Sequence, residues 1–416
     1  MRRPSLDPRF PIVSACVIGT ILSATPVILM TFGLFVIPVA QDFHWPRARV
    51  SGVLLLLCLV SAAAYPIAGR LSDRYGARRL IVPASLLLAL AIAAVAVSDG
   101  NVVQFYLLFG LIGLAGALPC TMMFSRVISE WFDERRGLML GLVAGIGNGV
   151  GATIMPLVAM GLLRAFGWRG AYLGLGGCVA LFSFPALLLM LRDRTGSEPR
   201  ATSVLAPAGM SLAAAARTPT FWVILIAIAL GAGCITAIVS HIVPMLSDRG
   251  IPLTVSVPIM SALAATCTIW QIVTGFMMDR SRSPRLMAPF YFAALIGLPL
   301  LQSNSVPLLM LGGVCIGIGL GTEYGALPYI ISRYFGLRSY GAIAGVMYSA
   351  VLLAQGLTPM MMDVVFDRTG SYRLSIYGIG AALAAGTLLL GLLKPYAARR
   401  RQSSVVVPSM LAPPTA

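Results

Sequence analysis

The sequence predicts an all-α integral membrane protein with twelve transmembrane helices in two pseudo-symmetric halves of six helices. Three observations support this fold class. The 416 residues are 58% hydrophobic and only 11% charged, whereas an ordinary globular chain is about a quarter charged. The apolar residues form long runs between short polar turns, and landmark residues of the first half recur 206 residues later.

Each apolar run is long enough for a spanning helix, which needs about 20 residues. The twelve predicted spans cover residues 12–40, 47–69, 79–98, 102–128, 137–165, 168–191, 220–247, 255–278, 285–303, 305–333, 339–365 and 372–394. Residues 1–191 therefore form one half and residues 220–394 the other. A polar cytoplasmic linker, residues 192–219, joins them, and residues 395–416 are expected to be a disordered cytoplasmic tail. The first run is too long for a signal peptide, so it is expected to be retained.

The internal repeat indicates that the two halves arose by duplication. Gly69, Asp73 and Arg74 are each followed 206 residues later by the same residue type, at Gly275, Asp279 and Arg280. Chance similarity between apolar helices would not keep a glycine, an acid and a base in register together. Parallel halves of this kind occur in secondary transporters, where they are related by an axis along the membrane normal.

The basic residues predict the orientation of the chain. The net charge is +16, but the basic residues lie in short turns rather than in one soluble domain, which argues against nucleic acid as a partner. With the N-terminus inside, 23 of the 30 Lys and Arg residues fall on the cytoplasmic side. The positive-inside rule then places both termini in the cytoplasm. We expect a multi-pass protein of a cell membrane, namely a bacterial inner membrane.

Several kinds of chemistry are not indicated. The sequence has only two histidines and no paired carboxylates of the kind that an active site would need. It contains no catalytic constellation, so an enzyme is not expected. The seven cysteines lie singly within apolar runs, without the spacing of a metal or redox site. No metal or other cofactor is therefore expected. Transport is expected to be coupled to protons.

The most informative stretch, GRLSDRYGARRL, covers residues 69–80 between the second and third runs. One acid and four arginines in twelve residues must lie in a short aqueous turn, because charge is costly within the bilayer. The first glycine can allow a close helix approach, and the second can supply a turn conformation. The pattern resembles the signature loop between helices 2 and 3 of the major facilitator superfamily. The matched residues are Gly69, Asp73, Arg74, Gly76, Arg78 and Arg79.

Three further stretches, 31–56, 125–151 followed by 166–176, and 331–359, are similar to the monocarboxylate and oxalate-formate porter branch of that superfamily. The resemblance implies twelve helices, alternating access and a small carboxylate as substrate. One feature departs from the branch, whose members commonly carry an arginine within helix 8. Here the middle of that helix offers Thr266, Thr268, Trp270 and Gln271 but no cation.

Polar residues within the spans are the candidates for substrate binding or coupling. Glu323 lies ten residues before the end of the tenth span, roughly 15 Å along the helix and near the midplane. It is either a proton-coupling or substrate-binding acid, or a structural acid hydrogen-bonded between helices. The other candidates are Thr25, Thr31, Phe124, Asn148, His241, Gln271, Tyr324, Tyr329, Tyr348 and Gln355. For each of these, packing or interhelical hydrogen bonding is the alternative role; His241 is expected to be a solvated or packing residue.

A second group of residues is predicted to control the conformational cycle. By resemblance, Asp73 should meet the positive N-terminal end of the eleventh helix. Arg78 or Arg79 is expected to pair with Glu130 or Asp133, and Arg126 to extend to the membrane interface. Asp279 and Arg280 belong to the degenerate copy of the loop, in which Arg282 replaces the turn glycine. That copy is therefore not expected to form the same turn.

The sequence as a whole favours a secondary active transporter, a symporter or an antiporter, that moves a small organic solute by alternating access. An efflux permease for amphipathic or neutral compounds remains the alternative. A membrane sensor or assembly protein is less favoured, because the chain has no long soluble signalling domain. The expected partners are the solute and the lipid bilayer, and the expected state is a monomer.

Overall fold

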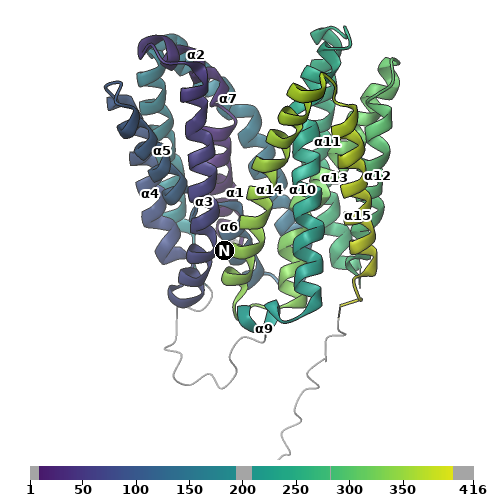
Figure 1. Cartoon of the computed structure of the whole chain (residues 1–416). Coiled ribbons are helices and arrows are strands. Elements are labelled where there is room, and N and C mark those ends of the chain that lie inside the picture. The colour runs from purple at the N-terminus through teal and green to yellow at the C-terminus, as the bar shows by residue number, and fades with distance from the viewer. Residues whose placement is uncertain (1–8, 194–208, 282, 397–416) are drawn as a thin grey trace, which may run out of the picture.

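A computed structural model describes residues 9–193, 209–281 and 283–396. These residues are almost entirely helical and form two bundles that lie side by side (Figure 1). The N-terminal bundle contains α1 (Arg9–Ile21), α2 (Gly33–Asp42), α3 (Arg47–Tyr75), α4 (Arg78–Ala94), α5 (Val102–Gly116), α6 (Thr121–Trp131), α7 (Arg136–Cys178) and α8 (Phe184–Met190). The C-terminal bundle contains α10 (Pro219–Ser247), α11 (Leu253–Arg280), α12 (Met287–Leu300), α13 (Val306–Tyr334), α14 (Tyr340–Thr369) and α15 (Arg373–Leu392).

The helices are consistent with the twelve predicted spans. Ten helices of the described chain are long and apolar enough to cross a membrane. The longest of them, Arg136–Met190, contains two of the predicted spans, joined at Gly167, whose φ of +66° interrupts the helix. The apolar helix Pro284–Leu300 is shorter and matches the predicted ninth span.

Two predicted spans are not continuous helices, contrary to the sequence analysis. The first is divided into α1, a π-helical turn at Thr25–Leu29, and α2. Pro26 lies at the start of that turn and has no N–H to donate to the preceding turn. The fourth is divided between α5 and α6, where Pro119 precedes the non-helical Cys120. Both breaks expose side chains and backbone at positions that a straight helix would cover.

Part of the predicted linker is ordered against the C-terminal bundle. Residues 194–208 of the linker and residues 397–416 of the predicted tail lie outside the described residues, as does Arg282. The described end of the linker includes the short helix α9 (Leu212–Ala216), and the N–H of Met210 donates to the carbonyl oxygen of Phe335 at 2.8 Å. We call the end of the molecule that bears α9 the α9 face; α3 and α11 also end there (Figure 1).

The buried apolar side chains form three clusters, which differ at the two ends of the molecule. Towards the α9 face, one cluster joins residues of both bundles, among them Phe124, Phe221 and Tyr340. Towards the opposite face there are two separate clusters, one confined to the N-terminal bundle and one to the C-terminal bundle. The bundles are thus packed together at the α9 face and have separate cores at the other.

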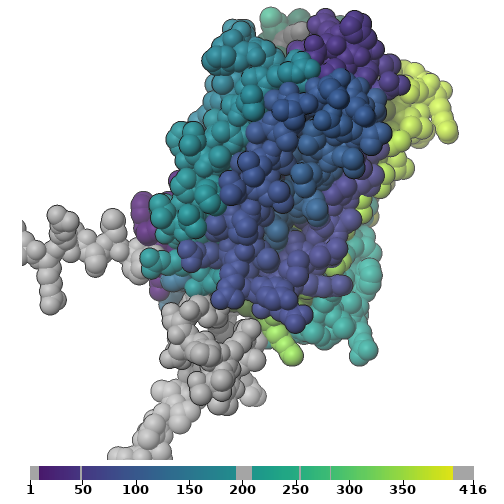
Figure 2. Space-filling view, turned by 90° about the vertical axis from the view of Figure 1, so that its left-hand side faces the viewer, coloured from purple at the N-terminus to yellow at the C-terminus, as the bar shows by residue number. Residues whose placement is uncertain are grey.

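The outer surface of each bundle is apolar, as lipid contact requires. Leu90 on α4, Leu107 on α5 and Leu189 on α8 expose 59%, 67% and 72% of their surface. Figure 2 shows this side of the N-terminal bundle, where α4 and α5 (blue) lie beside teal segments of later sequence.

Glycines make the contact between the bundles possible. α3 crosses α14 where Gly69 meets Gly341, and α7 crosses α11 where Gly137 meets Gly275. A Cβ atom at Gly69 would overlap the backbone carbonyl of Gly341. Small residues at such crossings let helix backbones approach closely.

We therefore expect Gly69→Ala to lower the stability of this conformation by about 1–3 kcal/mol, the usual cost of overpacking. Thermal unfolding in detergent would measure the change. Gly356→Ala on α14 is the matched control, because nothing lies within 4 Å of the added Cβ. Equal unfolding midpoints for the two variants would contradict the role of this crossing.

Candidate functional site

Two carboxylates bind helix N-termini across the interface between the bundles. Asp73 accepts hydrogen bonds from the backbone N–H groups of Gly341 and Ala342, at 2.9 and 2.8 Å. The first turn of a helix leaves its N–H groups unpaired and carries a partial positive charge, so a carboxylate is favourable there. The predicted contact between Asp73 and the eleventh predicted helix is therefore observed. That helix is α14.

The repeat of the motif makes the equivalent contact. Asp279 accepts hydrogen bonds from the N–H groups of Gly137 and Leu138, at 2.7 and 2.9 Å, at the start of α7. Each bundle therefore provides one aspartate that caps a helix of the other bundle. The expected difference in the turn after Asp279 involves Arg282, which lies outside the described residues.

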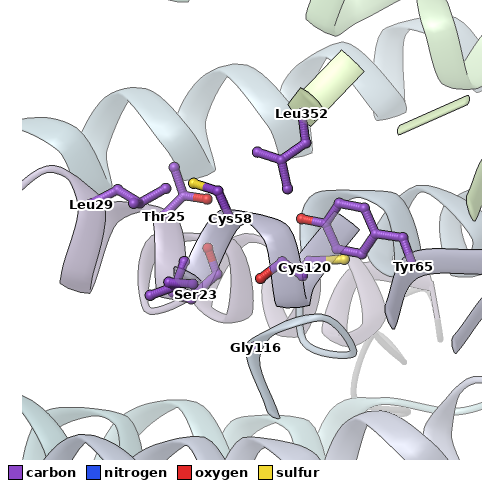
Figure 3. Close-up of a pocket in the computed structure, with 11 residues that line it drawn as sticks. Ser23, Thr25, Leu29, Cys58, Tyr65, Gly116, Cys120 and Leu352 are labelled. Carbon is purple, nitrogen blue, oxygen red and sulfur yellow. The ribbon is translucent and has the colours of Figure 1, made fainter. Parts of the chain in front are cut away.

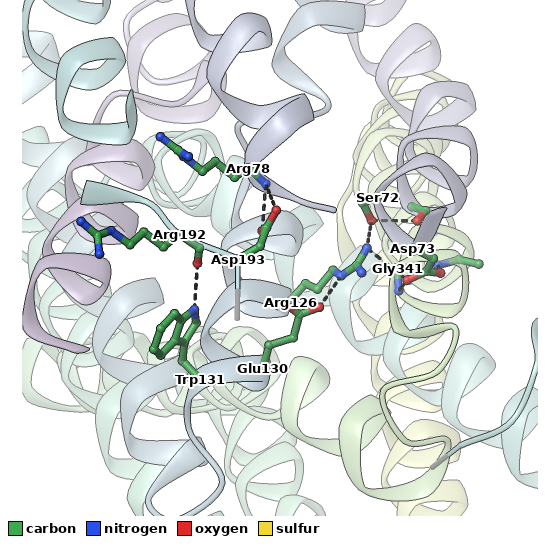
Figure 4. Close-up of polar contacts among 11 residues, drawn as sticks. Ser72, Asp73, Arg78, Arg126, Glu130, Trp131, Arg192, Asp193 and Gly341 are labelled. Atoms are coloured by element: carbon green, nitrogen blue, oxygen red, sulfur yellow. Dashed lines mark hydrogen bonds and ion pairs between the residues drawn. The ribbon is translucent and has the colours of Figure 1, made fainter. Parts of the chain in front are cut away.

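Arg126 on α6 links the first of these contacts to Glu130. Its guanidinium group lies 3.1 Å from Asp73 and 3.0 Å from Glu130, and it also donates to the hydroxyl of Ser72 (Figure 4). Arg126 is only 7% exposed. The expectation that Arg126 extends to the membrane interface is therefore wrong, because two carboxylates hold it within the protein.

The expected pairing of Arg78 or Arg79 with Glu130 or Asp133 is also wrong. Arg78 donates its backbone N–H to Asp193 at 3.0 Å and its guanidinium group to the carbonyl oxygen of Leu188 at 2.9 Å. Among the described residues, the ion pairs of Glu130 and Asp133 are with Arg126 and Arg136. Arg79 lies at the surface. The closer bases on α6 and α7 provide these pairs instead.

Gly76 has a conformational role and a steric one. Its φ of +89° is strained for other residues. A Cβ atom there would also lie 2.5 Å from a carboxylate oxygen of Asp193, at the start of the linker. The side chain of Trp131 binds the preceding linker residue, donating to the carbonyl oxygen of Arg192 at 2.8 Å (Figure 4). Arg74 of the motif lies over the ring of Tyr75, and Arg280 of the repeat lies over the ring of Phe276.

A small cavity with both polar and apolar lining residues lies at the breaks in the first and fourth spans, with a volume of about 30 Å³ (Figure 3). This is room for about two water molecules. The lining is shared by the N-terminal bundle and by Leu352 of α14, so both halves contribute. Its polar members carry no net charge and comprise Ser23, Thr25, Cys58, Ser61, Tyr65 and Cys120.

Of these lining residues the sequence analysis identified only Thr25. Tyr65 and Ser61 were missed because they lie on α3, the second span, whereas candidates were sought on other helices. Ser61 donates to the carbonyl oxygen of Gly113 at 3.0 Å, so part of the cavity wall is fixed by hydrogen bonding between α3 and α5. The position of Cys120 depends on the break at Pro119, which the sequence did not predict.

Three predicted residues of the C-terminal bundle lie near this cavity. Gln355 donates to the hydroxyl of Tyr324 at 3.1 Å, which joins α14 to α13. Tyr65 is close enough to interact electrostatically with Tyr324 and Cys120, and Tyr348 is close enough to Tyr65 and Cys120. The structure therefore gathers hydroxyl, thiol and amide groups from both bundles around Tyr65.

Glu323 lies in the middle of α13, 1% exposed, and neither of its carboxylate oxygens has a hydrogen-bond partner in the described residues. The predicted alternative, an acid hydrogen-bonded between helices, is therefore not observed there. Its surroundings are Tyr291, Cys234 and Cys267, which interact with it electrostatically. An ionised carboxylate without a partner is costly in such surroundings, so the protonated form is favoured.

Gln271 lies near Glu323 but is largely a packing residue. It is 3% exposed, donates weakly to the sulfur of Cys267 at 3.5 Å, and leaves its own oxygen without a partner. Its backbone is in contact with Gly141 of α7 and Gly325 of α13. It therefore occupies the point where three helices meet.

Five predicted residues do not line the cavity. Thr31 donates to the carbonyl oxygen of Val27 at 2.6 Å within its own helix. Phe124 packs against Gly19, and Tyr329 accepts from Arg333 at 3.0 Å towards the α9 face. Asn148 is half-buried on α7. His241, expected to be a solvated or packing residue, is buried, and its Nε2 atom lies within hydrogen-bond distance of Asp363.

These features define a class of protein. Two duplicated helical bundles, a cavity that both of them line and capping contacts between them at the α9 face are the parts of a membrane transporter that works by alternating access. The chain belongs to the Major Facilitator Superfamily, whose family profile matches residues 16–359. It is accordingly a multi-pass membrane transporter, and the prediction that it is not an enzyme is confirmed.

Individual relatives are more distant. The chain is 28% identical to human Monocarboxylate transporter 11 over 385 residues, which cover 87% of this chain and 78% of the relative. It is 24% identical to the uncharacterized MFS-type transporter YhjX of Escherichia coli, covering 80% and 83%. The E. coli fucose:proton symporter FucP superposes with a TM-score of 0.69 at 15% identity, covering 93% of this chain and 98% of FucP. The fold and the resemblance to monocarboxylate transporters are thus confirmed.

Removal of one capping charge should loosen the closed α9 face. Asp73→Asn replaces the carboxylate with a neutral amide. The NH2 group of that amide cannot accept a hydrogen bond, so one of the N–H groups of Gly341 and Ala342 loses its acceptor. A hydrogen bond to a charged group contributes about 1.5–3 kcal/mol, so we expect about a tenfold rise in opening at this face.

The measurement is the labelling rate of Cys120, with the other six cysteines replaced, by an impermeant maleimide added at the α9 face. Cys120 is only 9% exposed in the closed structure. Glu134→Gln is the control, because it removes an exposed acid near the same face. An unchanged labelling rate in Asp73→Asn would contradict the role of the cap.

Proposed function

We propose that this protein is a secondary active transporter for a small organic solute, with a small carboxylate as the first candidate. The observation that carries the proposal is the cavity beside Tyr65. Its polar lining comes from the N-terminal bundle and Leu352 from the C-terminal bundle, and the hydroxyls of Tyr324 and Tyr348 lie close to Tyr65. It lies where the shared core of the α9 face gives way to the two separate cores. A relative named as a monocarboxylate transporter supports the choice of solute.

The chemistry of the lining limits how a carboxylate could bind. The polar lining residues are hydroxyls and thiols, and α11 provides no cation in its middle. A carboxylate would therefore be bound by neutral donors such as Tyr65 and Thr25, or would bind as the protonated acid. The same lining also favours the alternative, an efflux permease for amphipathic or neutral compounds.

Alternating access in this proposal proceeds by rocking of the two bundles. In the described conformation the caps of Asp73 and Asp279 close the α9 face. The bundles would separate there and come together at the opposite face, exposing the solute to the other side. The arginine distribution supports a cytoplasmic location for the α9 face and both termini, and we propose a monomer in a bacterial inner membrane.

Proton coupling is assigned to Glu323 in this proposal. The acid is buried without a partner, so loss of its proton requires a change in its surroundings. Rocking of the C-terminal bundle, which includes α11 and α13, against α7 would supply that change by admitting water or solute. Protonation and conformation would thereby be linked.

Glu323→Gln mimics the protonated acid and should abolish uptake driven by a proton gradient. Exchange of labelled for unlabelled solute should persist, because exchange needs no net proton movement. Both activities can be measured in proteoliposomes, with Glu134→Gln as the control for loss of an acid. Full gradient-driven uptake by Glu323→Gln would exclude the proposed coupling role.

The choice of solute can be tested by uptake of a panel of carboxylates, with and without a pH gradient. Tyr65→Phe should raise the half-saturation concentration roughly three- to tenfold, since it removes one hydrogen bond. Tyr172→Phe, buried in the N-terminal bundle, should leave it unchanged. Export of dyes or drugs with no uptake of any carboxylate would instead favour the efflux permease.

A further inference from the structure

A buried imidazole and an acid on a neighbouring helix meet in the C-terminal bundle, away from Glu323 and the cavity. His241 on α10 is 6% exposed, and its Nε2 atom lies 2.8 Å from a carboxylate oxygen of Asp363 on α14. Both residues lie about six residues, or roughly 9 Å, from the end of their helix opposite the α9 face.

The other ring nitrogen determines the proton count. Nδ1 of His241 lies 2.8 Å from the carbonyl oxygen of Ala237. A carbonyl oxygen can only accept, so Nδ1 must carry a proton. In a neutral imidazole Nε2 would then have only a lone pair, which cannot bind an ionised carboxylate. The 2.8 Å contact therefore requires one more proton, on Nε2 or on the carboxyl group.

The surroundings indicate where that proton resides. The side chain of Asp363 is 64% exposed. Carboxyl groups ordinarily bind protons more weakly than imidazoles. Tyr372 at the start of α15 lies edge-on to the His241 ring and within the electrostatic influence of Asp248, Asp363 and Asp367. Among the described residues, no Lys or Arg forms an ion pair with these three acids.

We propose that His241 and Asp363 form a proton-binding site, occupied by one proton in the conformation closed at the α9 face. The proton resides on Nε2 of His241 and ties this part of α14 to α10. Its loss would place a nitrogen lone pair against a carboxylate and release α14 at this point. Below the pair, α10 and α14 remain in contact at Gly233 and Thr358.

The proton can be observed directly, without knowledge of the solute. The chain has only two histidines, His44 and His241. His44 is exposed with a φ of +54°, which asparagine tolerates, so His44→Asn leaves a single histidine. Solid-state NMR of the full-length variant in liposomes, with 15N-labelled histidine, would then report the protonation of both His241 nitrogens.

At pH 7.5 a free imidazole is only about a tenth protonated. We expect two protonated ring nitrogens in His44→Asn and one in His44→Asn/Asp363→Asn. His44→Asn/Asp367→Asn is the matched control and should resemble His44→Asn, because Asp367 lies one turn away on α14. A neutral His241 in His44→Asn, or an unchanged spectrum in the Asp363→Asn variant, would overturn the proposal. Failure to find a transported solute would not affect this test.

Discussion

The capping of two helix N-termini by carboxylates from the opposite bundle is the constraint on which the conformation depends. α14 and α7 both begin within the contact between the bundles, where their first N–H groups need acceptors. Asp73 and Asp279 provide them. Both acceptors can reach those groups only because glycines at the crossings bring the backbones together. The single core at the α9 face follows from the same approach.

The two caps are alike in geometry but differ in their surroundings. Asp73 also has Arg126 as a partner, so its charge remains compensated when α14 moves away. Asp279 forms no ion pair among the described residues. Separation at the second crossing therefore removes the hydrogen-bond donors of a carboxylate that has no ion pair to retain. Only the aspartate and the glycines are needed for the cap itself, which explains why it survives in the degenerate repeat.

The fold was largely predictable, because hydropathy and the repeat are properties of long segments. The helix breaks at Pro26 and Pro119 were not. Proline in a membrane helix is a poor indicator of a break, since Pro66, Pro156 and Pro328 all lie inside continuous helices here. Whether a proline interrupts the helix depends on the neighbours that satisfy the freed carbonyl groups, which come from distant parts of the chain.

The site was harder to predict than the fold because its residues are distinguished by partners on other helices. A threonine such as Thr31 can bond to the carbonyl group one turn earlier, so its position in a span says little. A carboxylate has no donor with which to do the same, and the second nitrogen of His241 faces away from its own helix. Their partners must therefore come from another helix, from a proton or from the solute. Glu323 and His241 are therefore the groups that we propose respond to conformation, whereas hydroxyls such as that of Thr31 only maintain it.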